Sequence, residues 1–216
     1  MTINIEFYFD PSCPWCWLTS RWLTEVSEHR DLNITWLPFS LALKNNELSG
    51  NDSTGHLDNH VSSHRVLRVI EAIIESEDIE RGELYSQFGK AYFVGGSRDY
   101  TIIADEVLKR LKLNPDYAQC ADDIRYDDRL RTHINNATNI VGNDVGVPLI
   151  IFVNEKGDKQ GYFGPVLQSL PDTEDSLKIW DALEVLGSSS IFLELKQSRK
   201  ERPKFETTKR LFSDLD

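Results

Sequence analysis

One short segment near the start of the chain restricts its fold more than any other feature. Residues 3–9, INIEFYF, alternate apolar and polar side chains and predict a strand. The turn formers Asp10-Pro11-Ser12 end it, and apolar residues then recur at helical spacing from about Pro14 to the polar break at Arg30-Asp31. Residues 33–39, NITWLPF, predict a second strand. Strand, helix and strand within about forty residues form a βαβ unit, whose two strands should run parallel.

Two cysteines lie at the junction of the first strand and the first helix, in Cys13-Pro14-Trp15-Cys16. A thiol at a helix N-terminus is favoured in its ionised, nucleophilic form by the free backbone N–H groups and the helix dipole. Cys16 follows one helical turn later, close enough to form a disulfide with Cys13. Pro14 suits a first helical turn because its missing N–H is not needed there. The spacing therefore predicts a reactive pair with Cys13 nearer the exposed end.

Two other interpretations of the pair are weaker. A structural zinc site needs four ligands, and only Cys120 remains, so the site would have to recruit a distant histidine. A purely structural pair is disfavoured because strand-to-helix turns concentrate function in α/β folds, and because Trp15 and Trp17 flank the thiols. Three cysteines in a chain with no export signal do not form a disulfide framework.

Strand signals return only near the end of the chain. Val147-Pro148 precedes a β-branched run, a turn and the second strand of a predicted hairpin that ends near Gly164. A helix ending at Gly187 follows, and a short last helix is predicted from Ile191 to Ser198. The region between the two strand-containing parts has no convincing strand. Its helical patterns lie near Val66 to Ile74, Leu84 to Phe93, Ile102 to Leu111 and Asp116 to Asn135. We expect an α/β domain, residues 1–40 and 141–216, interrupted by an all-helical insertion domain, residues 41–140.

Charge and hydropathy exclude several classes of protein. A net charge of -11 and a pI near 4.9 argue against a general nucleic-acid binder, which needs a basic surface to release phosphate counterions. Only the segment from Lys196 to Arg210 is basic, and we interpret it as a solvated or self-docked tail. No window approaches the roughly 18 apolar residues needed to cross a bilayer. The start, MTINIEFYFD, lacks the basic and apolar regions of a signal peptide. We therefore expect a cytoplasmic protein with no nucleic-acid or membrane partner.

The order of these features resembles the DsbA-like thioredoxin-fold family: βαβ with CxxC at the first helix, a helical insertion, a proline before a β-hairpin, and a final helix. Five stretches are more specifically similar to the actinobacterial mycothiol-dependent nitroreductase branch. They are FDPSCPWCWLTSRWL, VGNDVGVP, YFGPVLQSLP, LKIWDA and FLELKQSR. These stretches cover both ends of the chain in order, whereas about a hundred residues in the middle match only loosely.

This resemblance implies roles for the site residues. Cys13 would be the redox-active thiol and Cys16 the resolving thiol, with a cis peptide bond at Val147–Pro148 facing the pair. That bond would leave the neighbouring backbone open to a substrate or to a small thiol. The expected substrate-binding residues are Pro14, Trp15, Val147 and Pro148. No metal and no tightly bound cofactor are expected, and mycothiol is the expected co-substrate.

One departure from the branch concerns the middle region. Members of the branch carry a histidine in a Gly-x-x-x-His sequence, whereas Gly89-Lys90-Ala91-Tyr92-Phe93 places Phe93 there. The departure weighs against nitro-compound activity more than against thiol chemistry. Kappa-class glutathione transferases and hydroxychromene-carboxylate isomerases are similar in fold, but they usually bear a serine at the position of Cys13.

Three other groups of residues were candidates for function. His56, His60 and His64 follow each other at intervals of four, a spacing that can bind a metal. We interpret them as a solvated face, because a loop-like segment precedes them and the HExxH glutamate is absent. Cys120 is interpreted as a small residue on a helix. Among the aromatic residues only Trp15 is expected to line a pocket. The others are expected in the core: Tyr8, Trp17, Trp36 and Tyr162.

The sequence thus predicts a cytoplasmic thiol–disulfide oxidoreductase that uses mycothiol to reduce disulfides or small electrophilic or nitro compounds. Its partners would be a small-molecule thiol or disulfide and a thioredoxin-type reductant. Two alternatives remain: a non-catalytic thioredoxin-fold binding module, and an enzyme like the kappa-class transferases or hydroxychromene-carboxylate isomerases. The sequence assigns no oligomeric state.

Overall fold

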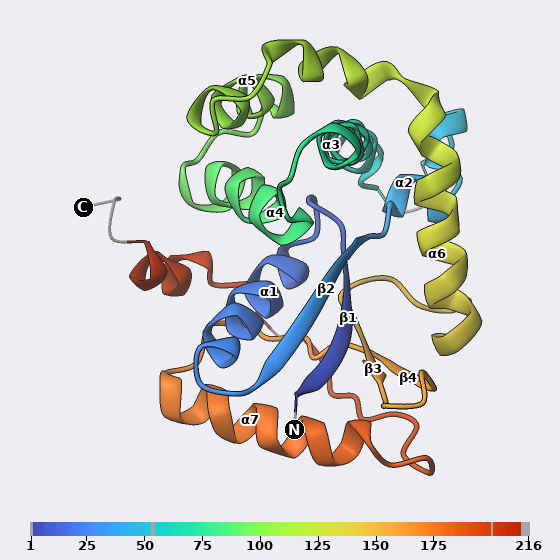
Figure 1. Ribbon diagram of the computed structural model, residues 1–216, viewed down its shortest axis with the longest axis vertical. Coiled ribbons are helices and arrows are strands. Elements are labelled where there is room, and N and C mark those ends of the chain that lie inside the picture. Colours follow the sequence, from blue (N-terminus) through green and yellow to red (C-terminus); the bar gives the residue numbers. More distant parts are fainter. Residues whose placement is uncertain (1, 53–54, 200, 213–216) are drawn as a thin grey trace. The chain divides into compact units, whose positions relative to one another are not determined.

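Four strands form one sheet in the computed structural model, which describes residues 2–52, 55–199 and 201–212 (Figure 1). They are β1 (Ile3–Phe9), β2 (Leu32–Pro38), β3 (Leu149–Val153) and β4 (Lys159–Phe163), in the order β2-β1-β3-β4. The chain divides into two compact units. The first comprises residues 1–8, 14–35 and 137–216, and the second comprises residues 9–13 and 36–136. The sheet belongs mainly to the first unit.

The strand directions follow from the backbone hydrogen bonds. The Ile3 N–H donates to the Asp31 carbonyl where β1 and β2 begin. The Phe39 N–H donates to the Phe9 carbonyl just beyond the point where they end. These two strands are therefore parallel, whereas β3 runs antiparallel to both β1 and β4. The predicted βαβ unit and the predicted hairpin are both confirmed.

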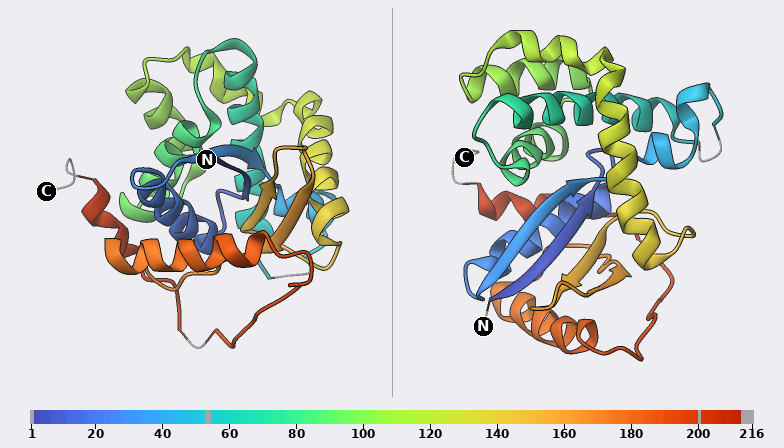
Figure 2. Two further views of the ribbon diagram at one scale, coloured as in Figure 1. Left: turned by 60° about the horizontal axis from the view of Figure 1, so that its bottom comes forward. Right: turned by 45° about the vertical axis from the view of Figure 1, so that its right-hand side comes forward.

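Two helices of the first unit, α1 (Pro14–Ser27) and α7 (Thr173–Gly187), pack against each other and cover the sheet (Figures 1 and 2). Trp22 of α1 and Trp180 of α7 are fully buried, with ring centroids 6.0 Å apart. The last residue of α7, Gly187, lies so close to β3 that a Cβ there would be 2.3 Å from the Phe152 ring. A side chain at this position would push α7 off the sheet. Burial of such large apolar surfaces is the main stabilising contribution to this unit.

Apart from Phe9 of β1 and the last residues of β2, the elements of the second unit are helical. Its elements are α2 (Leu41–Lys44), η1 (Glu47–Ser49), α3 (Leu57–Ser76), α4 (Arg81–Gly89), the π-helical turn η2 (Lys90–Val94), α5 (Tyr100–Arg110), η3 (Pro115–Asp122), η4 (Ile124–Tyr126) and most of α6 (Asp127–Val141). No strand occurs among the described residues between 41 and 140, as predicted. Residues 41–140 as a separately inserted domain stay a prediction.

Helix α3 begins nine residues before the predicted Val66, at Leu57. The first half of the helix, LDNHVSSHR, has only Leu57 and Val61 as apolar residues, which is too few for periodicity alone to detect it. Its inward face is polar instead: His60, Ser63 and His64 are all buried. Hydrogen-bonded side chains, described below, do there what apolar packing does in the second half.

Two predictions for the helices need correction. The pattern from Asp116 to Asn135 is divided between η3, η4 and α6, because Asp123 caps a new turn by accepting from the Arg125 N–H. The helix predicted from Ile191 to Ser198 is absent, and this segment is irregular. Three of its large apolar side chains are 83–89% exposed: Ile191, Leu193 and Leu195. So short a helix needs tertiary packing to form, and only Phe192 packs here, on the Tyr162 ring with centroids 5.6 Å apart.

The basic C-terminal segment is docked on the first unit. Its last element, the 3-10 helix η5 (Phe205–Leu211), was not predicted. Thr208 is fully buried and accepts a hydrogen bond from Trp17 Nε1 of α1 at 3.3 Å. Phe212 stacks on the same indole, with centroids 6.1 Å apart. The described part of the chain contains no helix with the length and apolar character needed to cross a membrane.

Candidate active site

Cys13 immediately precedes α1, and the local sequence fixes the backbone there. The Cys13 N–H donates to the Asp10 carbonyl at 3.0 Å, which closes a tight turn before the helix. Pro14 then begins α1, where its missing N–H costs nothing. Cys13 is 7% exposed, whereas Cys16, one helical turn further along, is fully buried. Cys13 therefore keeps a small accessible surface that Cys16 lacks.

The carboxylate of Asp10 organises the turn that carries Cys13. Asp10 is fully buried. Its Oδ1 accepts from the Ser12 N–H at 2.8 Å, from the Ser12 hydroxyl at 2.6 Å, and from the Ser63 hydroxyl of α3. Its Oδ2 accepts from the Leu41 N–H at 2.8 Å. One side chain thus satisfies four donors and ties the turn to both α2 and α3.

Tyr100 supports the same turn from α5. Its phenol donates to the Pro11 carbonyl at 3.4 Å, and its ring stacks on Tyr92 with centroids 4.8 Å apart. Burial, together with Tyr92 and the negative charge of Asp10, raises the pKa of Tyr100 well above its ordinary value of 10.0. Tyr100 therefore keeps its proton at neutral pH and remains a donor to the Pro11 carbonyl.

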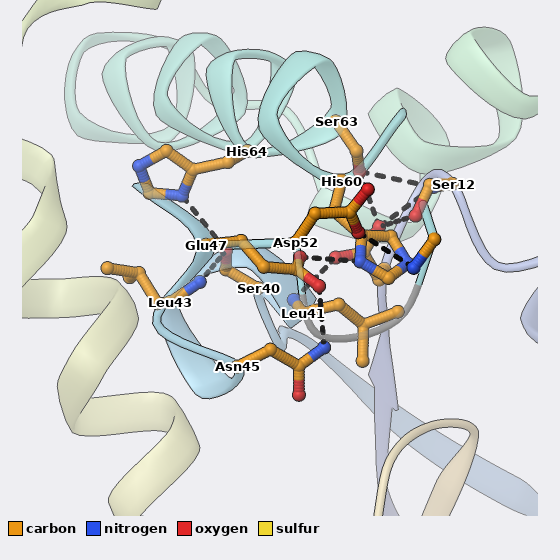
Figure 3. Close-up of polar contacts among 12 residues, drawn as sticks. Ser12, Ser40, Leu41, Leu43, Asn45, Glu47, Asp52, His60, Ser63 and His64 are labelled. Atoms are coloured by element: carbon orange, nitrogen blue, oxygen red, sulfur yellow. Dashed lines mark hydrogen bonds and ion pairs between the residues drawn. The ribbon is translucent and has the colours of Figure 1, made fainter. Parts of the chain in front are cut away.

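His64 is fully buried and belongs to a hydrogen-bonded chain, so its assignment to a solvated face was wrong (Figure 3). Its Nδ1 lies 3.0 Å from Ser40 Oγ, and its Nε2 lies 3.1 Å from Asp127 Oδ1. A carboxylate can only accept, so Nε2 carries the proton and Nδ1 accepts from Ser40. Ser40 Oγ in turn accepts from the Leu43 N–H and caps α2. With His64 neutral, both of its ring nitrogens and the Ser40 hydroxyl have hydrogen-bond partners.

The surroundings of His64 favour that neutral form. Burial lowers its pKa from the ordinary value of 6.5, and the positive charge of Arg68 acts in the same direction. The negative charge of Asp127 acts to raise the pKa of His64, but its effect is smaller than that of burial and Arg68. Arg68 already holds the Asp127 carboxylate with two hydrogen bonds of 2.7 and 2.8 Å. Those bonds and His64 also lower the pKa of Asp127, against the effect of its burial.

This shift predicts a pH dependence of stability. Below about pH 6.5 the unfolded chain protonates His64 at its ordinary pKa, whereas the folded chain resists protonation until a lower pH. The free energy of unfolding should therefore fall as the pH drops from 6.5. In urea unfolding between pH 5 and 7, His64→Gln should be less stable than wild type and show a shallower slope. The exposed His29 provides the matched control, His29→Gln, which should keep the wild-type slope. If the unfolding free energy of His64→Gln varied with pH as steeply as that of wild type, His64 would not be the cause of the pH dependence.

The other two histidines of the series do not join His64 in a common site. His60 is 8% exposed and its Nδ1 lies 2.7 Å from Glu47 Oε2, which is also buried. His56 precedes α3 and is exposed, so it alone fits the predicted solvated face. Among the described residues, no three histidine, cysteine or carboxylate side chains are grouped so that they could hold a metal ion.

Pro148 lies buried at the start of β3, in the same unit as Pro14, Trp15 and Cys16. The Val147–Pro148 peptide bond is cis. The Gly164 N–H donates to the Pro148 carbonyl at 2.8 Å, and the following Pro165 carbonyl accepts from Thr19 Oγ1 of α1 at 2.7 Å. The segment after β4 therefore ties β3, the strand that follows Pro148, to α1, the helix that begins with Pro14 of the CPWC motif.

The aromatic residues divide only partly as predicted. Tyr8 and Trp17 are buried in the core, and Trp15 is half-buried. Trp36 and Tyr162, also predicted in the core, are only half-buried, because they lie on the edge strands β2 and β4 of the sheet. The guanidinium of Arg199, from the C-terminal segment, lies over the Trp15 ring at 5.3 Å. Sequence reasoning missed Arg199, because nothing in its local pattern indicates that residue 199 returns to the start of α1.

Phe93, at the position where a histidine was expected, lies in the π-helical turn η2. It is 7% exposed, and its ring meets Tyr92 edge-on with centroids 4.8 Å apart. A phenyl ring has no proton to transfer, so this position cannot supply an acid or a base. Asp10 and Tyr100 were also missed, although the Asp-Pro-Ser sequence is typical of a turn closed by an aspartate side chain.

Similarity to known proteins agrees with this geometry. Residues 12–197 match the model of the Rv2466c-like family, described as mycothiol-dependent nitroreductase Rv2466c. The uncharacterized protein Rv2286c of Mycobacterium tuberculosis is 26% identical over 199 residues, which are 91% of this chain and 82% of that protein. The matched range includes both Cys13 and Cys16.

Solved structures show the same fold at low identity. The cytosolic disulfide reductase DsbM from Pseudomonas aeruginosa has a TM-score of 0.55 at 18% identity, over 85% of this chain and 99% of that chain. A 2-hydroxychromene-2-carboxylate isomerase has a TM-score of 0.58 at 14% identity, over 85% and 95%. The probable DsbA oxidoreductase SCO1869 from Streptomyces coelicolor has a TM-score of 0.51 at 16% identity, over 92% and 95%. These likenesses confirm the DsbA-like thioredoxin fold, and the match over residues 12–197 shows that the chain belongs to the Rv2466c-like family of mycothiol-dependent nitroreductases.

Proposed function

We propose that this chain is a cytoplasmic thiol–disulfide oxidoreductase in which Cys13 is the nucleophile and Cys16 the resolving thiol. The observation that carries the proposal is the unequal burial of the two cysteines at the start of α1: Cys13 keeps 7% of its surface exposed, whereas Cys16 keeps none. Membership of the Rv2466c-like family supports the same class of chemistry.

The reaction divides into two exchanges. The Cys13 thiolate attacks one sulfur of a substrate disulfide, forms a mixed disulfide and releases the other half as a thiolate. The Cys16 thiolate then attacks Cys13 Sγ, releases the second half, and leaves a Cys13–Cys16 disulfide. Two equivalents of a small thiol restore the dithiol form and are themselves joined in a disulfide. Mycothiol is the proposed small thiol, as the family description suggests, and a thioredoxin-type protein could serve the same step.

Support for a small thiol as co-substrate also comes from the fold. A structure of DsbM from Pseudomonas aeruginosa with GSH shares this fold, with a TM-score of 0.54 at 16% identity. The proposed substrate-binding residues are those beside the thiols and at the Pro148 strand: Pro14, Trp15, Val147 and Pro148. Disulfides are the preferred electron acceptors in this proposal, because Phe93 offers no proton donor for the reduction of a nitro group.

Thiol counting tests the proposal directly. In denaturing buffer the reduced chain should give three thiols per molecule, from Cys13, Cys16 and Cys120. After mild oxidation of the folded protein, wild type should give one thiol, and three again after reduction by mycothiol. Cys13→Ser should keep its two thiols through the same oxidation and should lose disulfide reductase activity.

The matched control is Cys120→Ser, which removes a cysteine on η3 and should leave both reversible oxidation and activity unchanged. A wild-type chain that keeps three thiols after oxidation would contradict the proposal. The same result would favour a binding module, for which Cys13→Ser should leave partner binding intact. Isomerase activity that survives Cys13→Ser would instead favour the hydroxychromene-carboxylate isomerase alternative.

A further inference from the structure

We propose that Arg199 makes the thiol site selective for negatively charged substrates, such as disulfides or other electrophiles that bear carboxylate groups. This inference rests on the proposed function, since it assigns a substrate class to the same site. Arg199 is exposed and belongs to the irregular segment between α7 and η5. It would act by attracting the substrate to Cys13, not by taking part in the exchange.

The position of Arg199 is set by two aromatic rings. Its guanidinium carbon lies 5.3 Å from the centroid of the Trp15 ring and 5.5 Å from that of Phe163. Trp15 lies between the two cysteines in the sequence. Phe163 is the last residue of β4 and pairs with Leu149, the residue after Pro148. Arg199 therefore contacts both the start of α1 and the β3–β4 hairpin. These two parts of the first unit carry or adjoin the proposed substrate-binding residues.

The charge of Arg199 is available to a ligand. Among the residues that the structure describes, no carboxylate forms an ion pair with it. Two other arginines of the first unit are paired with carboxylates, Arg30 with Asp181 and Arg210 with Glu25. Stacking on a ring face orients a guanidinium and leaves the N–H donors in its plane free to bind a carboxylate. Such a group is held in place before the substrate arrives.

The overall charge makes this local cation significant. A chain with a net charge of -11 repels anionic substrates at long range. An isolated guanidinium beside the CPWC motif reverses that effect locally, over about 10 Å at moderate ionic strength. For a substrate with two carboxylates, loss of one such charge should slow the reaction about 3- to 10-fold at low salt. An uncharged substrate should be unaffected.

Two chromogenic disulfides separate charge from packing. The reduced protein reacts in a single turnover with 5,5′-dithiobis(2-nitrobenzoate), a dianion, and with 4,4′-dithiodipyridine, which is uncharged at pH 8. Arg199→Gln should slow the first reaction about 3- to 10-fold and leave the second within about 2-fold. Arg199→Lys keeps the charge and should recover most of the loss. Added NaCl should slow the reaction of wild type with the dianion more than that of Arg199→Gln.

Lys196 provides the matched control, since it is an exposed cation on the same segment. Lys196→Gln should leave the ratio of the two rates at the wild-type value. An equal slowing of both reactions in Arg199→Gln would overturn the inference and make Arg199 a packing residue, and no change in either rate would also overturn it. Failure of the proposed function is distinguishable, because wild-type Cys13 would then react without forming a disulfide with Cys16.

Discussion

Replacing Asp10 with alanine is expected to destabilise the chain by about 3–5 kcal/mol, measured by urea unfolding at pH 7. The buried carboxylate satisfies the N–H groups of Ser12 and Leu41 and the hydroxyls of Ser12 and Ser63. Alanine would remove the acceptor of the Leu41 N–H and of the two hydroxyls in a buried site, and would leave the Ser12 N–H only the Ser63 hydroxyl at 3.1 Å. The reactivity of Cys13 towards a disulfide should also fall, because the turn that holds it loses its central contact.

Two further variants make the Asp10 prediction specific. Asp10→Asn keeps the size and one oxygen, so its loss of stability should lie between those of wild type and Asp10→Ala. The exposed Asp144 is the matched control, and Asp144→Ala should change stability by less than about 0.5 kcal/mol. An Asp10→Ala variant as stable as wild type would show that the carboxylate contributes nothing to the turn.

Replacing Arg210 with methionine should cost about 2–3 kcal/mol of unfolding free energy. Removing one member of a buried ion pair costs about 3–5 kcal/mol, and the value is lower here because the Arg210 side chain is 41% exposed. Glu25 on α1 is 5% exposed. Arg210 donates to both of its carboxylate oxygens, at 2.8 and 2.9 Å, and also to the Pro171 carbonyl. The variant leaves a carboxylate at the α1–α7 contact without its cation.

The pH dependence of this loss identifies its cause. Burial acts to raise the pKa of Glu25, but the bonds from Arg210, Thr173 and Ser176 outweigh it and lower that pKa below 4.5. Because the pKa of Glu25 is lower in the folded chain, its carboxylate stabilises the fold above pH 4.5. This contribution is lost as the carboxylate is protonated at lower pH. The difference between wild type and Arg210→Met should therefore shrink below that pH. The neighbouring Lys209 is the control, since Lys209→Met removes an exposed cation and should be nearly neutral. A loss that does not change with pH would contradict the ion pair.

The parts of the fold that follow from apolar periodicity were predictable from the sequence. Alternation in residues 3–9 and helical spacing after Pro14 report on which faces are buried, and burial of those faces is what forms these elements. The same reasoning failed for Ile191 to Ser198, where Phe192 packs on Tyr162 but the other large apolar side chains are exposed. An apolar pattern states what a segment can bury, and the rest of the chain decides whether it does.

The polar part of the site was predictable only in the CPWC motif itself. Cys13 and Cys16 are neighbours in sequence, so their relation follows from helix geometry alone. Asp10, by contrast, acquires its role from Ser63 and Leu41, and His64 from Ser40 and Asp127. These partners come from distant parts of the chain, and a buried histidine has the same local sequence signature as an exposed one. Arg199 was missed for the same reason.

The pairing of β1 with β3 has a consequence for how the protein is made. Tyr8 and Leu149 lie opposite each other but about 140 residues apart in the sequence. At a synthesis rate of about 5–20 residues per second, the CPWC motif leaves the ribosome about 7–30 s before the strand that begins beside Pro148. During this interval neither thiol is buried by the finished fold. Protection of the nascent pair from oxidation must therefore come from a reducing compartment or from chaperones, and not from the protein's own structure.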